Sequence, residues 1–74
     1  MKVYRTTMYF TRNADGKNTQ CAAIVAARSK KEAAAALGLS MYTFNNYASE
    51  TGNDEDIKIA LKTPGQVVIR EFFE

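Results

Sequence analysis

Cys21 is the residue in this chain best suited to nucleophilic chemistry, because it carries the only thiol. Such chemistry needs a base to accept the thiol proton, and the chain contains no histidine. Cys21 also lies in an apolar run of alanine, isoleucine and valine, where a neutral thiol fits well. The sequence therefore predicts a buried structural cysteine and, with a single thiol, no intrachain disulfide.

A run of three carboxylates, Asp54, Glu55 and Asp56, offers hard oxygen ligands for a cation. The spacing and the closing glutamate of an EF-hand loop are missing, however. Asn53 precedes the run and can cap a helix, whose first turn favours negative charge. We therefore interpret the run as the solvated start of a short helix. Because no acid–base pair, nucleophile elbow or cofactor fingerprint is present either, we expect no catalytic, metal or cofactor site and infer a protein that is not an enzyme.

The polar side chains with the clearest geometry lie in the stretch Ser29 to Tyr47, which predicts two short helices joined by a tight turn. Ser29 can cap the first helix, with Glu32 three residues on to close a capping box. Gly38 suits the left-handed residue that ends a helix, and a second helix can run from Ser40 to Ser49. Apolar residues at helical spacing let the two helices bury one shared face. These residues are Ala33, Ala34, Leu37, Leu39, Phe44 and Tyr47.

The stretch resembles the helix-turn-helix of bacterial and phage regulators. Its turn is Gly38-Leu39-Ser40, Ala34 is the small residue four positions before the glycine, and large rings replace the family's aliphatic residues in the second helix. The resemblance implies a repressor whose second helix enters the major groove of double-stranded DNA. The candidate phosphate contacts are Arg28, Lys30 and Lys31, and the candidate base contacts are Ser40, Met41, Tyr42, Asn45 and Asn46.

The charge around the second helix favours a different interpretation. Residues 40–49 contain no lysine or arginine, and residues 50–56 add four carboxylates. Duplex DNA affinity is dominated by phosphate neutralisation, so a strong binder carries a denser basic face. The alternative of a structural corner with surface asparagines therefore stays open.

The remaining segments predict strands around these helices. Lys2 to Arg12 and Thr19 to Ala27 are rich in β-favouring and apolar residues, and Asp15-Gly16 between them suits a hairpin turn. A third short helix follows Asn53, Thr63-Pro64-Gly65 ends it, and Gln66 to Phe73 predicts a last strand. We expect one α+β domain, residues 1–74, in the order ββαααβ. The C-terminal strand should pair with the hairpin in a small antiparallel sheet, with the helices on one face.

Aromatic residues should fill most of the core of so short a chain. Alternation in the first strand places Tyr4, Met8 and Phe10 on one face, which we expect to be buried. Phe44 and Tyr47 should also be core, whereas Tyr9 and Tyr42 should be exposed. Phe72 and Phe73 are adjacent, so they point to opposite faces of a strand and one must face solvent or a partner.

Charge is distributed unevenly along the chain. Residues 1–37 carry seven Lys and Arg against two Asp and Glu, whereas residues 38–74 carry three against six. A basic half can face nucleic acid or an acidic protein surface. The N-terminus lacks the apolar block of a signal peptide, and no stretch is long enough to span a membrane. We expect a cytoplasmic protein, in the host cytoplasm if phage-encoded, that does not bind membranes and is a monomer or homodimer.

Most of the chain also resembles the small lytic-phage regulators that bind host RNA polymerase. The similar segments are the first strand, SKKEAAAALGLS, NNYASETGN and TPGQVVIR. The resemblance implies a transcription regulator that binds the polymerase and inhibits or modifies host transcription. An edge strand of the hairpin or the C-terminal segment would then contact the partner. The candidate contact residues are Lys2, Arg5, Tyr9 and Arg12. Inhibition of another host protein, such as a defence protein, is an alternative.

Overall fold

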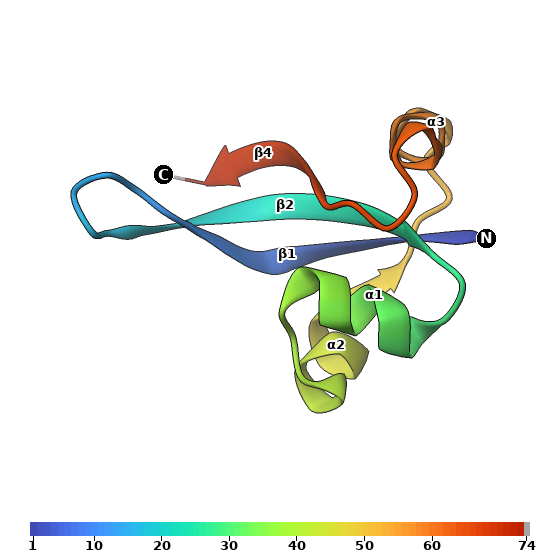
Figure 1. Ribbon diagram of the computed structural model, residues 1–74, viewed down its shortest axis with the longest axis horizontal. Coiled ribbons are helices and arrows are strands. Elements are labelled where there is room, and N and C mark those ends of the chain that lie inside the picture. Colours follow the sequence, from blue (N-terminus) through green and yellow to red (C-terminus); the bar gives the residue numbers. More distant parts are fainter. Residues whose placement is uncertain (74) are drawn as a thin grey trace.

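The computed structural model describes residues 1–73, which form a four-stranded antiparallel sheet and three helices (Figure 1). The α+β class and the order ββαααβ are confirmed, with one additional short strand between the second and third helices. The elements are β1 (Lys2–Arg12), β2 (Asn18–Ala27), α1 (Lys30–Leu37), α2 (Met41–Tyr47), β3 (Ala48–Glu50), α3 (Asp54–Lys62) and β4 (Val68–Phe73).

The hairpin of β1 and β2 is the centre of the sheet, whose strand order is β3-β1-β2-β4. β3 pairs with β1 through Tyr4 to Thr6 only, while β4 pairs with β2 from Gln20 to Ile24. The C-terminal strand therefore pairs with the hairpin, as predicted. β1 lies inside the sheet near its start, so the N-terminal part of the hairpin is not an edge.

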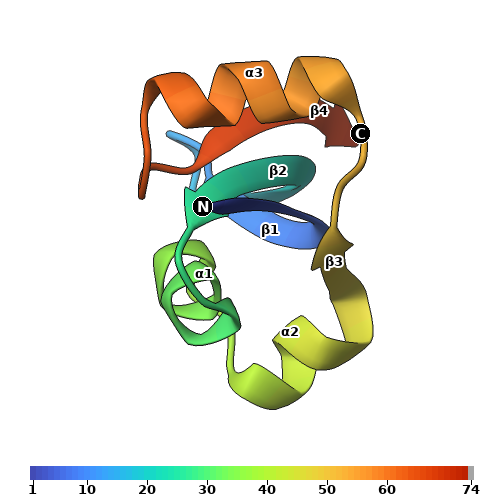
Figure 2. The ribbon, with the colours of Figure 1, turned by 90° about the vertical axis from the view of Figure 1, so that its right-hand side faces the viewer.

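The helices cover both faces of the sheet, so the expectation that they share one face was wrong. α1 and α2 lie against one face and α3 against the other, as Figure 2 shows. The cause lies in β2, where Cys21 to Ala27 are all buried and side chains of both faces are apolar. Since exposure of either apolar face to water would be unfavourable, helices pack on both faces of this strand.

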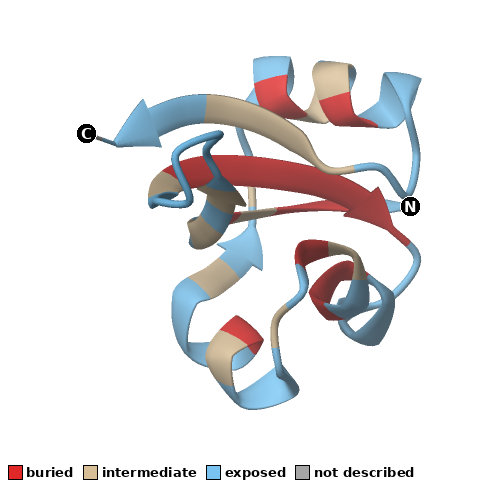
Figure 3. Ribbon diagram, turned by 60° about the vertical axis from the view of Figure 1, so that its left-hand side comes forward, coloured by how far each residue is buried: buried red, intermediate tan, exposed pale blue. Residues whose placement is uncertain are grey.

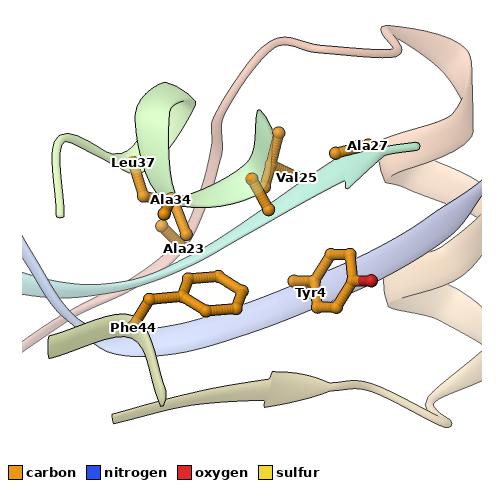
Figure 4. Packing of buried hydrophobic residues seen from close by; sticks show 8 residues of the cluster. Tyr4, Ala23, Val25, Ala27, Ala34, Leu37 and Phe44 are labelled. Carbon is orange, nitrogen blue, oxygen red and sulfur yellow. The ribbon is translucent and has the colours of Figure 1, made fainter. Parts of the chain in front are cut away.

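The larger core lies under α1 and α2 (Figure 4). Tyr4 and Phe44 pack edge to face, with ring centroids 5.5 Å apart and an interplanar angle of 62°. Small residues of β2 and α1, such as Ala23 and Ala34, let the helix approach the sheet closely. On the other face, Val3, Ile24 and Ala26 pack against Ala60 of α3 in a smaller cluster.

A register shift in β1 between Thr6 and Tyr9 changes which side chains are buried. Thr6 is buried, and its Oγ1 accepts from the Met8 amide at 3.0 Å and donates to the Tyr47 carbonyl at 2.9 Å. After the shift Tyr9 packs against the larger core, while Phe10 is 50% exposed and Met8 is half-buried. The prediction of one buried face carrying Tyr4, Met8 and Phe10 was therefore wrong. An inserted residue reverses the alternation beyond it.

The predicted N-cap residues are present, but the Glu32 carboxylate accepts from the Arg28 amide at 3.2 Å and not from the Ser29 amide of the predicted capping box. The side chains of Ser29, Ser40 and Asn53 each accept from the backbone amide three residues on. Gly38 has φ +72° and ends α1, as expected. The second helix is shorter than predicted, because it ends at Tyr47 and Ala48–Glu50 enters the sheet as β3. Tyr47, expected in the core, is exposed at this junction.

Candidate functional site

The strongest charge cluster joins three elements at the face covered by α3. Asp56 of α3 is only 3% exposed, so it is not the solvated helix start that we expected. Its Oδ2 accepts from Arg5 Nη1 of β1 at 3.1 Å, and its Oδ1 accepts from Arg70 Nε of β4 at 2.9 Å. Thr51 Oγ1 donates to the same carboxylate at 3.4 Å. We call Arg5, Asp56 and Arg70 the ion-pair latch.

The latch is built to hold structure rather than to bind a cation. Two guanidinium groups compensate the buried carboxylate, and no buried side-chain nitrogen or oxygen within residues 1–73 lacks a hydrogen-bond partner. A further ion pair joins Arg70 Nη2 to Glu55 Oε1 at 3.4 Å. Within the same residues, no group of three or more acidic or cysteine side chains is arranged to hold a metal ion. The sequence alone did not indicate the latch, because its members lie 51 and 14 residues apart.

The four candidate protein contacts do not form one surface. Arg5 belongs to the latch. Tyr9 was expected to be exposed, but it is half-buried on the opposite face, against the core under α1, because of the register shift in β1. Lys2 pairs with Glu50 at 3.6 Å at the start of the sheet, where both side chains are exposed. Arg12 is exposed at the far end of β1, beside the hairpin turn.

The candidate DNA contacts are all exposed around the corner of α1 and α2. Tyr42 is 79% exposed, and Asn46 donates its side-chain amide to the Tyr42 carbonyl at 2.7 Å. Ser40 caps α2, so its hydroxyl is already engaged with Thr43. Lys30 and Asn45 line one hollow of about 310 Å³ above Tyr4 and Phe44. Of the candidate DNA contacts, the structure therefore brings Lys30 and Asn45 together. Lys2 and the carboxylate of Glu50 line the same hollow. Arg28 and Lys31 are also exposed, before and within the first turn of α1.

A second exposed surface lies at the far end of the hairpin, where the sheet extends beyond α3 (Figure 3). Phe10 of β1 pairs with Gln20 of β2, and Gln20 pairs with Phe73 of β4. Paired residues of neighbouring strands point to the same face, so the three side chains form one row. Phe10 and Phe73 are 50% and 37% exposed. Sequence reasoning missed this row because simple alternation placed Phe10 in the core.

Phe72 lies on the face opposite this row, because it pairs with the inward-facing Cys21. It is 56% exposed, so both members of the Phe72–Phe73 pair face solvent. Cys21 itself is fully buried, and its Sγ donates to the Thr19 carbonyl at 3.5 Å. The predicted buried thiol is therefore confirmed.

Two further observations complete the description. None of the helices within residues 1–73 has the length and apolar character needed to cross a membrane. Comparisons with protein families, with curated proteins and with solved structures find no match to this chain.

Proposed function

We propose that this protein is a small non-enzymatic regulator that binds another protein, and that its partner is RNA polymerase of the host, whose transcription it inhibits or modifies. The proposal rests on the C-terminal edge of the sheet. This edge combines the two features that protein partners use most readily, exposed aromatic rings and an open strand margin.

The observation that carries the proposal is the exposure of Phe72 on β4. Within residues 1–73, β4 pairs with β2 on one side and with no strand on the other. A register shift opposite Ala22 and Ala23 divides the strand. Arg70 is the extra residue at the shift and belongs to the latch, whereas Glu71–Phe73 after it is exposed. We call Glu71–Phe73 the β4 margin. Large rings beside unpaired backbone groups favour a partner that covers them.

The choice of polymerase rests on the resemblance of the sequence to small lytic-phage regulators. The contact surface that we propose differs from the residues first considered. Arg5 is engaged by Asp56, so it is not available to steer a partner. The β4 margin contains Glu71 and two exposed rings, and it lies at the same end of the sheet as Arg12.

A second candidate function is the reading of duplex DNA by α2. One observation favours it, since Asn45 and Lys30 line the same hollow and Tyr42 projects from the first turn of the helix. Adenine recognition by asparagine with a nearby phosphate contact uses this combination. The helix has seven residues and no basic side chain, which gives it less charge than a strong duplex binder carries.

The test is capture of purified host RNA polymerase by the immobilised protein, with nuclease-treated samples throughout. We expect Phe72→Ser to weaken capture at least tenfold, because truncation of a central interface aromatic costs about 2 kcal/mol or more. Phe72 is exposed, so the variant should keep its thermal midpoint.

Tyr47→Ser provides the matched control, because Tyr47 is an equally exposed ring that lies outside the β4 margin. Capture that survives Phe72→Ser contradicts the proposed surface. A gel shift with duplex DNA that is lost in Asn45→Ala and weakened in Lys30→Ala supports the DNA-reading function instead. Retention of a different, identified host protein in place of the polymerase contradicts the choice of partner.

A further inference from the structure

The face of the hairpin beyond α3 is a second surface whose chemistry differs from that of the β4 margin. α3 covers this face only as far as Val3, Ile24 and Ala26. Figure 1 shows the hairpin continuing well past the helix. The uncovered part carries an open hollow of about 730 Å³, and its lining includes Phe10, Phe73 and several polar side chains.

Two rings stand on this face with an amide between them. Phe10, Gln20 and Phe73 occupy one row across three adjacent strands. Neighbouring strands are about 4.8 Å apart, so the two rings are separated by about 10 Å. That separation allows each ring to stack on a different base of an extended single strand. Gln20 Nε2 donates to the Thr7 carbonyl at 2.8 Å, which fixes the amide and leaves its oxygen as an acceptor between the rings.

Positive charge and further amides surround the row on the side of the hairpin turn. Arg12 lies two residues beyond Phe10 in β1, on the same face, and Lys17 and Asn18 line the hollow. Within residues 1–73, neither Arg12 nor Lys17 forms an ion pair. Glu71 lies on this face as well, next to the row on the side toward α3, because it pairs with Ala22. Asp15 of the turn accepts from the Lys17 backbone amide at 3.1 Å, so one carboxylate also lies on this side. Arg12 and Lys17 outnumber it, and the turn side of the row is therefore the more favourable side for a phosphate backbone.

We propose that this face, defined by Phe10, Arg12, Lys17, Asn18, Gln20 and Phe73 and here called the hairpin platform, binds single-stranded RNA. Phe10 and Phe73 stack on two bases, and Arg12 and Lys17 neutralise phosphates. The Gln20 oxygen accepts from a 2′-hydroxyl, the group that RNA has and DNA lacks. Proteins bind unpaired RNA with exposed aromatic rings that stack on bases, amide groups that bond to base edges, and Lys and Arg side chains that contact phosphates. Duplexes hide their base faces and cannot use the rings.

A protein occupant suits this face less well than RNA does. Protein interfaces bury a connected apolar centre, whereas here an amide separates the rings and the border is polar and basic. Phe73 belongs to both the β4 margin and this face, so it does not separate the RNA inference from the polymerase proposal. Phe72 and Phe10 do separate them, because Phe72 points to the opposite face from Phe10. The two proposals can therefore fail separately.

The test measures fluorescence anisotropy of a labelled oligouridylate of about ten nucleotides with the purified full chain. The same measurement is made with oligothymidylate and with an RNA duplex. We expect Phe10→Ala and Phe73→Ala each to weaken RNA binding about tenfold, the effect of losing one stacked base. Lys17→Ala should lower the slope of log affinity against log salt by about 0.7, the contribution of one phosphate contact.

Two variants on other surfaces serve as matched controls. Tyr47→Ala removes an exposed ring from α2, and Lys58→Ala removes an exposed lysine from α3, so neither should change RNA binding. Thermal unfolding of every variant checks that it is folded. Equal losses in Phe10→Ala and Tyr47→Ala, or no binding by the unaltered protein, overturn the inference. So does an affinity for oligothymidylate or for the RNA duplex that equals the affinity for oligouridylate. Loss of RNA binding in Phe10→Ala with polymerase capture intact supports it.

Discussion

At the scale of single residues, Asp56 has the largest effect on how neighbouring elements are held together. It is a buried carboxylate whose two oxygens are each bonded to an arginine from a different strand. Such a pair adds little net stability over an apolar replacement, but loss of one partner leaves charge without compensation. The latch therefore acts mainly by fixing where α3 and β4 lie relative to β1.

Asp56→Ala should lower the free energy of unfolding by about 2 to 3 kcal/mol, measured by urea denaturation. Removal of one member of a buried pair costs about 3 to 5 kcal/mol, and the partial exposure of both arginines reduces the loss here. Asp54→Ala is the control, because it removes an exposed carboxylate from the same helical turn and should cost less than about 1 kcal/mol. Equal effects of the two substitutions would show that only the helix dipole is at work.

The latch also shows where sequence reasoning reaches its limit. The caps of all three helices could be predicted, because a cap and its amide lie within three residues of each other. The partners of Asp56 could not, because the pairing depends on how β1 and β4 are placed in the sheet. The same carboxylate that looks solvated in sequence becomes buried once α3 docks.

At the scale of elements, the register shift in β1 decides which surfaces the protein presents. Before the shift, Tyr4 and Thr6 point to the larger core, and after it Tyr9 does so instead. Phe10 is thereby turned to the face where Phe73 lies. The strand itself was predictable from its β-branched and aromatic residues. The shift was not, because no glycine or proline marks it.

Thr6→Val should destabilise the domain by about 1 to 3 kcal/mol, because the hydroxyl that bonds both the Met8 amide and the Tyr47 carbonyl is lost. The valine keeps the shape of the buried side chain, so packing loss contributes little. Denaturant unfolding of Thr7→Val, an exposed neighbour, gives the reference value near zero. If the two variants unfold alike, the Thr6 hydroxyl does not hold the bulge.

At the scale of the whole molecule, the sheet separates two hydrophobic clusters of different size, one on each face. The face under α1 and α2 holds the Tyr4–Phe44 pair and a cluster of eight buried residues. The face under α3 holds a cluster of four. The sequence shows that both sides of β2 are apolar. This division could have been predicted from that observation, because each apolar side needs helices to cover it. The direction in which the chain turns after β3 then places α3 on the face that α1 and α2 leave open.

We therefore expect the segment α3–β4 to unfold locally while the hairpin, α1 and α2 stay folded. Native-state hydrogen exchange measures such local opening. Amides of α3 and β4 should exchange at lower free energies than the amides of β1 and β2 that bond to each other within the hairpin. Asp56→Ala should lower the opening energies of α3 and β4 while leaving the α1 amides nearly unchanged. Uniform acceleration across all elements would contradict this division.

The covering of one sheet by helices from both sides also has a consequence for the life of the protein in a cell. If residues 54–73 open as one unit, as predicted, the protein should spend part of its time in a three-stranded form that keeps its larger core. That form bares Ile24 and the edge of β2 and lengthens the free tail available to a protease. If a partner holds the β4 margin, as proposed, it should close this form, and turnover of the protein should then be slower in the presence of that partner.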